Sequence, residues 1–417
     1  MADYISLQSL YYKEDPLVRD AFLEKESQKR KSESSTFDIG INTKSGRLFL
    51  AVPRQLSLLN ETLLRVERKV SQLWHELPGI AQWAYLRGLI MNEIMSTNEI
   101  EGVYSTRRQI EKALVSAESK STKEYRRFKE FANLYLELTN NNHIYPKTPT
   151  DIRMIYDAVV AGELSENQQP DGILFRKDPV DIVAPTQKII HRGVLPESEI
   201  TRMLEQMIAL VDSGVIPPTF AAISAHFVFE YIHPFYDGNG RTGRYLLALY
   251  LSEPLSLATV LSLSSVIAEN KGSYYKAFAA AEKKLNKGEL TFFVIQMMEF
   301  IRMAQDSVIE ELEYKKYLLQ KAQVALDNFD ARPYSLSQKE KKVAFQALQH
   351  YLFDTFSEIS LSDISHYTEV GSQTARKYTI SLEEKGLLRT VSQKPLKFEL
   401  TEKALNVFTI EANLSPE

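Results

Sequence analysis

The feature that most constrains this chain is the run from His233 to Arg244, whose sequence is HPFYDGNGRTGR. Gly238 and Gly240 lack a side chain, so successive backbone N–H groups around them can converge on an anion. A helix that begins near Arg241 would point the positive end of its dipole at the same place. The run therefore predicts a loop and a helix start that hold phosphate groups.

The other side chains of this run have the chemistry that a polyphosphate site requires. Asp237 offers a hard oxygen ligand of the kind that Mg²⁺ takes when it also binds substrate phosphates. Arg241 and Arg244 stand three residues apart, so on a helix they share one face and present charged donors together. His233 is the candidate proton acceptor, because an unperturbed imidazole, with a pKa of about 6.5, is largely neutral near pH 7. The alternative is a glycine-rich helix start with a core histidine and a surface pair of arginines.

The run matches every fixed position of the motif HxFx(D/E)GNGRxxR, and through it the chain resembles the Fic family. Members of this family are mostly helical enzymes that transfer the AMP part of ATP to a Ser, Thr or Tyr hydroxyl of a protein. The resemblance implies that His233 deprotonates the target hydroxyl and that Asp237 holds Mg²⁺ on the α- and β-phosphates. Gly240 favours AMP transfer, because the related Doc kinases carry a lysine at that position.

The resemblance also implies how the chain holds ATP. Asn239 and the backbone amides of Gly238 and Gly240 would grip oxygens of the α- and β-phosphates. Arg241 would contact the β-phosphate and Arg244 the γ-phosphate. ATP is thus the expected co-substrate and Mg²⁺ the expected cofactor.

A downstream segment resembles the adenine side of the family's nucleotide site. Asn270 and the pair Tyr274 and Tyr275 correspond to an Asn and a Tyr pair of the family. An aromatic helix face packed in the core explains the two tyrosines equally well.

An upstream segment predicts a restraint on the enzyme. Thr97 to Gly102 fits the pattern (S/T)xxxE(G/N) of Fic proteins with an N-terminal inhibitory helix, and the preceding residues have helical apolar spacing. The resemblance implies that Glu101 pairs with Arg244 and blocks productive seating of the γ-phosphate, since a carboxylate and a phosphate compete for one guanidinium group. The alternative is a solvated glutamate at a helix end, followed by a glycine cap.

Residues 172–196 predict two short strands around a turn, with a corner at Pro185 and Thr186. In the family this place holds a flap that docks the target segment by strand addition. The expected docking residues are Val180, Ile182, Ile189 and Ile190. A plain surface hairpin is the alternative. His191-Arg-Gly-Val stands where a common family version closes with Pro-Pro, so the choice of target stays open.

Composition excludes several other kinds of site. The 417 residues contain no cysteine, so disulfides, thiolate metal sites and a cysteine nucleophile are ruled out. The formal charge of −4 gives no general attraction to nucleic acid. The first residues lack the regions of a signal peptide, and the apolar stretch 245–267 is interrupted by Glu253-Pro254 and serines, so it predicts two buried helices. We expect no membrane role and a cytoplasmic setting.

Hydrophobic periodicity and the positions of loop-forming residues predict a mainly α chain of three parts. Residues 1–110 form an N-terminal helical region that carries the inhibitory helix and has a loop at Lys29–Ser35. Residues 111–330 form the Fic-type helical domain with its short β-hairpin flap, and a long connector helix closes this part. Residues 331–417, beginning near Arg332-Pro333, form a separate α+β domain.

The last part resembles a winged helix-turn-helix. Its predicted elements are a helix from about Lys339, further helices at 362–367 and 373–385, and two strands. A DNA-binding interpretation places Gln373, Arg376 and Lys377 in a major groove. Lysine plus arginine only balance aspartate plus glutamate in this part, so contact with a protein, or between two copies of the chain, is equally supported.

Two hypotheses for function follow. The leading one is a protein adenylyltransferase that modifies a protein partner or itself and is restrained by Glu101 on Arg244. The alternative is a winged-helix DNA-binding regulator that uses the Fic domain as a nucleotide sensor. Pairing of two copies is frequent in the family, and the sequence leaves a homodimer open.

Overall fold

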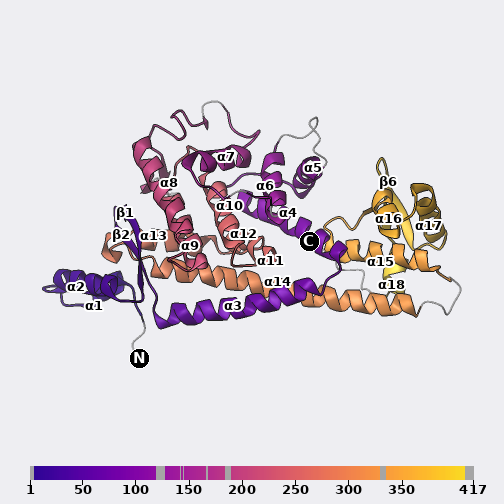
Figure 1. Ribbon diagram of the computed structural model, residues 1–417, viewed down its shortest axis with the longest axis horizontal. Helices are drawn as coiled ribbons and strands as arrows, with labels where there is room; N and C mark the ends of the chain where they lie inside the picture. The colour runs from indigo at the N-terminus through magenta and orange to yellow at the C-terminus, as the bar shows by residue number, and fades with distance from the viewer. Residues whose placement is uncertain are drawn as a thin grey trace. The chain divides into compact units, whose positions relative to one another are not determined.

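The computed structural model describes residues 4–118, 127–140, 142–143, 145–165, 168–183, 189–328 and 335–408. Within these residues the chain is mainly helical, with three small antiparallel sheets (Figure 1). The predicted mainly α fold class is therefore confirmed. The described residues contain no helix that is long and apolar enough to cross a lipid bilayer.

The chain divides into two compact units. The first comprises Met1–Arg68 and Ile90–Gln305, and the second comprises Lys69–Leu89 and Asp306–Glu417. The predicted three-part division stays a prediction. Its boundary near Arg332-Pro333 lies outside the described residues, as does the predicted flap corner at residues 185 and 186.

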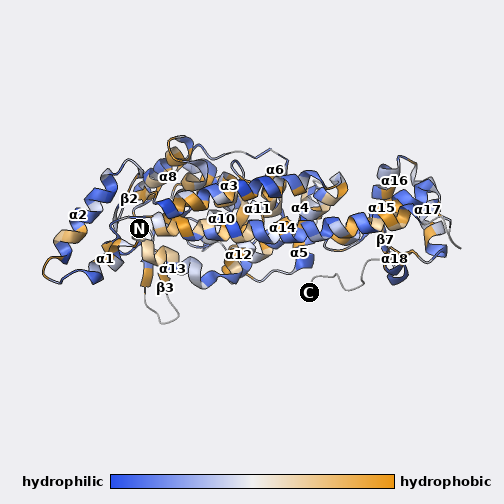
Figure 2. Ribbon diagram, turned by 90° about the horizontal axis from the view of Figure 1, so that it is seen from below, coloured by the Kyte–Doolittle hydropathy of each residue, from blue (hydrophilic) through white to orange (hydrophobic). Residues whose placement is uncertain are grey.

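Three long helices cross the limits between these units: α3 (Arg54–His75), α4 (Gly79–Ile100) and α14 (Thr291–Asp327). Helical spacing was predicted for the residues before Thr97, which lie on α4, and for the connector helix, which is α14. On α3 the fully buried positions Leu56, Leu63 and Val70 repeat at seven-residue intervals, so they share one face. Figure 2 shows hydrophobic and hydrophilic residues interleaved along this helix, as in any helix with one buried face.

Two helices form the centre of the first unit. They are α9 (Pro218–Ile232) and α10 (Asn239–Leu251), and they run side by side with α8 (Glu197–Asp212) against α9 and α7 (Pro149–Val159) against α10 (Figure 1). Nearly every residue of α9 and α10 is buried, as expected for helices that are covered on all sides. Pro218 opens α9, where its missing N–H removes no hydrogen bond.

The other helical elements of the first unit are α1 (Leu7–Lys13), α2 (Arg19–Ser32), α5 (Arg107–Glu118), α6 (Lys129–Thr139), α11 (Leu257–Val260), α12 (Leu263–Glu269), α13 (Lys271–Ala281) and the 3-10 turn η2 (Lys284–Asn286). Two local predictions were wrong. Lys29 to Ser32 belong to α2, because burial of Ser27 and Arg30 keeps this polar stretch helical. The apolar stretch 245–267 holds parts of three helices, since Ser256 caps the extra short helix α11.

An N-terminal hairpin was not predicted. Strands β1 (Thr36–Thr43) and β2 (Gly46–Ala51) pair antiparallel. On β1 only Ile39 and Ile41 are buried. So short an alternation of apolar and polar residues does not identify a strand in the sequence. At the hairpin tip the N–H of Lys44 donates to the Tyr231 hydroxyl at 2.9 Å, so the hairpin rests on the end of α9.

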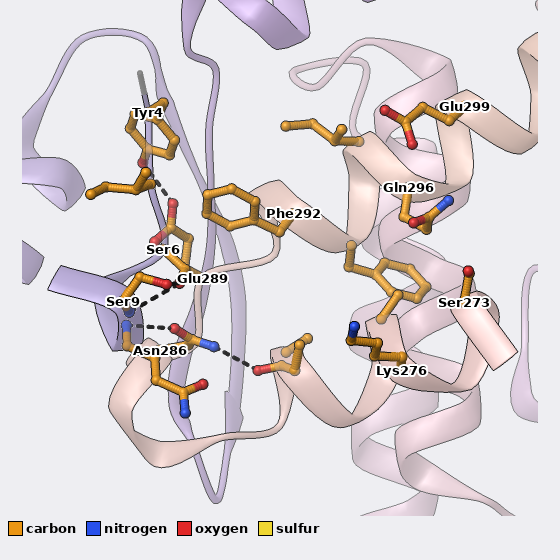
Figure 3. Close-up of a pocket in the computed structure, with 17 residues that line it drawn as sticks. Tyr4, Ser6, Ser9, Ser273, Lys276, Asn286, Glu289, Phe292, Gln296 and Glu299 are labelled. Carbon is orange, nitrogen blue, oxygen red and sulfur yellow. Dashed lines mark hydrogen bonds between the residues drawn. The ribbon is translucent and has the colours of Figure 1, made fainter. Parts of the chain in front are cut away.

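A buried ion pair joins the N-terminal segment to the chain before α14. Arg30 donates through Nη1 to Glu289 at 2.9 Å, through Nε to Glu26 and through Nη2 to the carbonyl of Ile5. The hydroxyl of Tyr4 donates to the other oxygen of Glu289, and Figure 3 shows these side chains pointing toward one another. Every nitrogen of Arg30 and both oxygens of Glu289 are therefore bonded. A cavity of about 510 Å³ lies beside this cluster, and none of the predicted site residues lines it.

The second unit contains α15 (Gln338–Phe353), α16 (Leu361–Thr368), α17 (Ser372–Glu384), α18 (Glu402–Val407) and a three-stranded sheet of β5 (Ile359–Ser360), β7 (Leu396–Leu400) and β6 (Leu388–Gln393), in that spatial order. Capping boxes begin α15 at Ser337 and α16 at Ser360. The predicted helices and the two predicted strands are present. The assignment as a winged helix-turn-helix stays a prediction.

We expect Arg30→Ala to destabilise the chain by about 3 to 5 kcal/mol, because Glu289 would be left buried without its cation. Arg47→Ala is the matched control, since Arg47 pairs with Asp38 where both side chains are half exposed, and its loss should be worth less than about 1 kcal/mol. Urea unfolding followed by circular dichroism at 222 nm measures both. Equal midpoints for the two variants would contradict the structural role of the buried pair.

Candidate active site

His233 follows directly after the last residue of α9 and has a left-handed backbone with φ 52°. This conformation is unfavourable for a residue with a Cβ, so its surroundings have to hold it. The N–H of His233 donates to the carbonyl of Phe229, which ends the helix. Its own carbonyl accepts from Nε of Arg176 at 2.8 Å. The ring is thereby carried at a fixed corner between α9 and the following loop.

Arg176 is fully buried and bonds only to backbone carbonyls. Besides His233 it donates to Asp178 at 2.8 Å and to Val194 at 2.9 Å. These carbonyls belong to the two ends of the flap region, so one guanidinium group ties the base of the flap to His233. No role was predicted for Arg176, and only its position at the start of the predicted hairpin pointed to it.

The environment of His233 favours the neutral imidazole. Burial lowers its pKa to about 3, and the neighbouring His191 and Arg176 add to the effect. The Nδ1 atom is buried and has no hydrogen-bond partner among the residues described here. The ring is therefore favoured in its neutral form, in which one of its two nitrogens can accept a proton.

The loop after His233 is braced from within. Asn239 accepts the N–H of Phe235 through its side-chain oxygen at 2.9 Å and donates back to the Phe235 carbonyl at 2.8 Å. Its amide group is therefore engaged with backbone. Gly238 precedes α10 with φ 79°, and a Cβ there would lie 2.6 Å from Val160. Only glycine fits this position, which directs the first N–H groups of α10 to one place.

Arg244 is buried and is bound by one turn of α4. Its Nε donates to the Thr97 hydroxyl at 2.7 Å, and its Nη2 donates to the Thr97 carbonyl at 3.1 Å and to Oε1 of Glu101 at 2.8 Å. Burial alone would lower the pKa of Arg244, but Glu101, Tyr274 and Glu230 raise it, so Arg244 stays positively charged. The ion pair predicted between Arg244 and Glu101 is present.

Glu101 covers the start of α10. A Cβ on Gly240 would collide with the Glu101 carboxylate, so this carboxylate lies directly against the backbone of the glycine-rich loop. Gly102 follows at the end of α4, and its N–H donates to the carbonyl of Glu99. The place where the sequence predicts phosphate oxygens is thus next to a carboxylate of the chain itself.

Arg241 is bound by a different carboxylate. Its Nη1 donates to Oε2 of Glu163 at 2.8 Å, and both side chains are buried. Glu163 lies in the turn after α7 and was not singled out in the sequence. Arg241 and Arg244 share the first turns of α10 as expected, and each of them holds an internal glutamate.

Asp237 is exposed at the edge of this loop, and its Oδ1 accepts the N–H of Gly238 at 2.6 Å. Over the described ranges no group of three or more His, Cys, Asp or Glu residues could hold a metal ion. Asp237 is therefore a single carboxylate ligand, which suits Mg²⁺ only when a substrate supplies further oxygens.

The predicted adenine-side residues lie in different environments. Asn270 joins α12 to α13, and its side chain donates to the carbonyl of Val266. Tyr274 is buried, and its hydroxyl bonds to Nε2 of His226 at 2.8 Å. Since Nδ1 of His226 faces the carbonyl of Gly243, it donates there and leaves Nε2 to accept from Tyr274. Tyr275 is half exposed, so only this tyrosine presents an open ring.

Two further buried acids lie behind Arg244. Burial raises the pKa of Glu93 to about 7 and that of Glu230 to about 8, with Arg244 opposing both shifts. Glu93 accepts from the N–H and the hydroxyl of Ser264. Glu230 packs against Gly243, where a Cβ would collide with its carboxyl group. At neutral pH both groups are largely or partly protonated, so Glu101 and Glu163 are the carboxylates that neutralise the motif arginines.

The flap forms as predicted from two short strands, β3 (Asp181–Val183) and β4 (Ile189–Arg192). Its expected docking residues Ile182, Ile189 and Ile190 are exposed, and Val180 precedes β3 and accepts the N–H of Gly193. His191 anchors the second strand. Its ring contacts Glu282 at 2.7 Å and the carbonyl of Tyr231 at 2.8 Å, both of which are hydrogen-bond acceptors.

The start of the flap region has its own anchors. Oε1 of Glu197 accepts the backbone N–H groups of Leu174 and Phe175, and its Oε2 accepts that of Ile173. The hydroxyl of Tyr236, the variable position of the motif, donates to Asp171 at 2.8 Å. The flap is thereby fixed at its base to the loop that carries His233.

The three predicted DNA contacts on α17 differ in their exposure and in their partners. Gln373 and Lys377 are exposed. Arg376 instead pairs with Glu383 at 3.3 Å and lies 5.3 Å from the centre of the Phe398 ring. This guanidinium group is engaged within the domain.

Comparison with known families gives one match. Residues 146–251 match the model of the Fic/DOC family. This segment contains the flap and the run from His233 to Arg244, so the predicted resemblance is confirmed over these residues. The segment around Thr97–Gly102 and the C-terminal domain lie outside the match.

Solved structures with distant likeness carry the same family name. A Fic family protein from Desulfovibrio desulfuricans G20 is 16% identical, with 82% of this chain and 96% of that chain covered and a TM-score of 0.46. Fic-1 from C. elegans, residues 134–508, is 16% identical, with 74% and 81% covered and a TM-score of 0.43. A Fic-domain-containing signaling protein from Bacteroides thetaiotaomicron VPI-5482 is 15% identical, with 60% and 94% covered and a TM-score of 0.39.

We expect His233 to stay neutral at pH 5, where an unperturbed imidazole with a pKa of about 6.5 is mostly protonated. Because protonation would place a charge in a buried site beside Arg176, the folded chain should resist it. Nitrogen chemical shifts of ¹⁵N-histidine-labelled protein report the charge, and comparison with His233→Ala assigns the signal. A His233 titration midpoint at 6 or above would contradict the proposed environment.

Proposed function

We propose that this chain is a protein adenylyltransferase that transfers AMP from ATP to a Ser, Thr or Tyr hydroxyl of a protein, the chain itself included. We further propose that Glu101 restrains it. One observation carries the proposal. The start of α10 brings two buried arginines and a glycine-rich backbone together beside a neutral histidine, and Arg244 there is held by Glu101.

The residues of the site fit a nucleotide triphosphate. The N–H groups at the start of α10 and the two arginines form a donor set for anions. Buried Arg241 has an Nε without a hydrogen-bond partner in the described chain, so the set can take further acceptors. Asp237 would hold Mg²⁺ together with the phosphates, and the ion when bound supplies charge neutralisation to them.

His233 would take the proton of the target hydroxyl. Its neutral ring and unpaired Nδ1 support this role, and such proton transfer typically contributes about 10²- to 10⁴-fold to a rate. Arg176 would act as a positioning residue, since it holds the carbonyl of His233 and both ends of the flap. The hydroxyl attacks the α-phosphorus, pyrophosphate leaves, and the chain's main task is orientation and charge stabilisation.

The flap would hold the target. It is a two-stranded ribbon, so each strand has an unpaired edge to which an extended segment can add. The exposed side chains of Ile182, Ile189 and Ile190 would provide apolar contacts along that segment. The tight anchoring by His191 and Glu197 keeps this edge at a constant position relative to His233.

The restraint follows from competition for Arg244. Glu101 lies on Gly240 and holds one nitrogen of the guanidinium group, so a γ-phosphate and this carboxylate need the same donor. Because Arg244 is buried, loss of Glu101 without a replacement would leave this cation short of an acceptor. A nucleotide must replace Glu101 or be held in an unproductive arrangement.

The alternative function, a DNA-binding regulator that senses nucleotide, has weaker support. Arg376 is engaged with Glu383, which leaves Gln373 and Lys377 as the exposed predicted contacts on α17. DNA-binding domains usually present a larger basic surface. A protein contact through this domain agrees better with the exposed Ile380 on the same helix.

We expect Glu101→Gly to raise AMP transfer roughly tenfold or more, since about 1.4 kcal/mol of relieved competition is already a factor of ten. Glu99→Gly is the matched control, because Glu99 lies in the same helical turn and pairs only with a surface lysine. Labelled ATP and gel autoradiography measure transfer to the chain itself and to lysate proteins. Equal transfer by the two variants would remove the restraint from the account.

In the Glu101→Gly background, we expect His233→Ala to reduce transfer by about 10²-fold or more while the affinity for Mg·ATP changes little. His366→Ala serves as control, because this histidine is exposed in the second unit. Calorimetric titration measures the affinity and labelled ATP the rate. Normal transfer by the alanine variant would show that another group takes the proton.

A further inference from the structure

Arg241, the first arginine of the run from His233 to Arg244, is contacted by a residue to which no role has yet been assigned. Glu163 binds Arg241, and both side chains are almost completely buried, with exposed fractions of 7% and 1%. Glu163 comes from the turn after α7, while Glu101 comes from the end of α4. Each of the two arginines at the start of α10 therefore pairs with a carboxylate from a different segment of the chain.

The pair of Glu163 and Arg241 is incomplete. It consists of one hydrogen bond, from Nη1 to Oε2. Oε1 of Glu163 and Nε of Arg241 are both buried, and neither has a partner within the described residues. Buried polar atoms without partners are rare and destabilising, so each such atom calls for an explanation.

A structural ion pair of the same chain shows the contrast. Around Arg30 and Glu289 every nitrogen of the guanidinium group and both oxygens of the carboxylate are bonded. A pair that served only to connect α7 and α10 would gain stability from the same saturation. The unpaired Nε of Arg241 instead leaves a donor available at the helix start, where an anion binds best.

From this geometry we infer that Glu163 is a specificity-determining residue of the nucleotide site, an inference that rests on the function proposed above. It occupies Arg241 until a phosphate replaces it, so that a nucleotide gains this arginine only if its phosphate chain extends beyond the α-phosphate. Glu163 would then lower the affinity of the site for di- and triphosphates but not for AMP, and so set the margin between them independently of Glu101.

Charge explains why the exchange selects phosphate chains. In the free chain each arginine is paired with a carboxylate, so a nucleotide gains an arginine only by displacing its carboxylate. A longer chain brings several charges and oxygens at once, and these can bond the Nε of Arg241 as well as the nitrogen that Glu163 now holds. Removing the charge of Glu163 should therefore help only those ligands that reach Arg241.

The test is calorimetric titration of the full chain with AMP, Mg·ADP and Mg·ATP. We expect Glu163→Gln to tighten Mg·ADP and Mg·ATP about fivefold to tenfold, because a neutral amide competes less well than a carboxylate for a guanidinium group. The affinity for AMP should change less than about twofold, because its single phosphate would not replace Glu163 on Arg241. Glu199→Gln, which removes an exposed partner of Arg202 on α8, is the control and should change none of the three.

Glu163→Asp keeps the charge but withdraws it by one methylene group, so it should shift Mg·ADP and Mg·ATP in the same direction by a smaller factor. This variant decides the question if the glutamine variant proves unstable in a thermal melt. Unchanged Mg·ADP affinity in the folded variants, or an equal gain for AMP, overturns the role of Glu163. If Glu101→Gly still transfers labelled AMP in that case, the proposed function stands without it. If no form of the chain binds any nucleotide, both fall together.

Discussion

The buried guanidinium group of Arg244 is the interaction around which this site is organised. An unpaired cation there would be strongly destabilising, and Thr97 of α4 and Glu101, directly after α4, supply its acceptors. The same cation is what a triphosphate would bind. Its need for a partner therefore brings the end of α4 onto the start of α10, and under the proposed function the same contact would restrain the enzyme.

A second buried cation, Arg176, fixes the surroundings of His233. Burial favours the neutral form of His233 by lowering its pKa, and His191 and Arg176, which also holds the flap, add to this effect. Flap position, backbone conformation of His233 and its charge are thus coupled through a few carbonyl contacts. Glu163 pairs with Arg241 in the same way that Glu101 pairs with Arg244, so the two internal carboxylates balance the two arginines at the start of α10.

Sequence alone could predict the parts that depend on local pattern. The long connector helix α14 was predicted, since its apolar positions repeat over many turns. The site from His233 to Arg244 is contiguous, so its spacing was visible, and Glu101 was reached through resemblance. Arg176, His191 and Glu163 were missed because their roles arise from contacts with distant segments. The helical state of Arg30 likewise depends on Glu289, which is 259 positions away.

The central claim is that internal carboxylates hold the place of nucleotide phosphates on α10. A crystal structure of the Glu101→Gly chain with Mg²⁺ and a non-hydrolysable ATP analogue tests it most directly. The account predicts phosphate oxygens against the backbone of Gly238 to Gly240, with Arg244 bonded to the phosphate chain. Nucleotide bound away from this loop, with Arg244 still bonded only to Thr97, would contradict it.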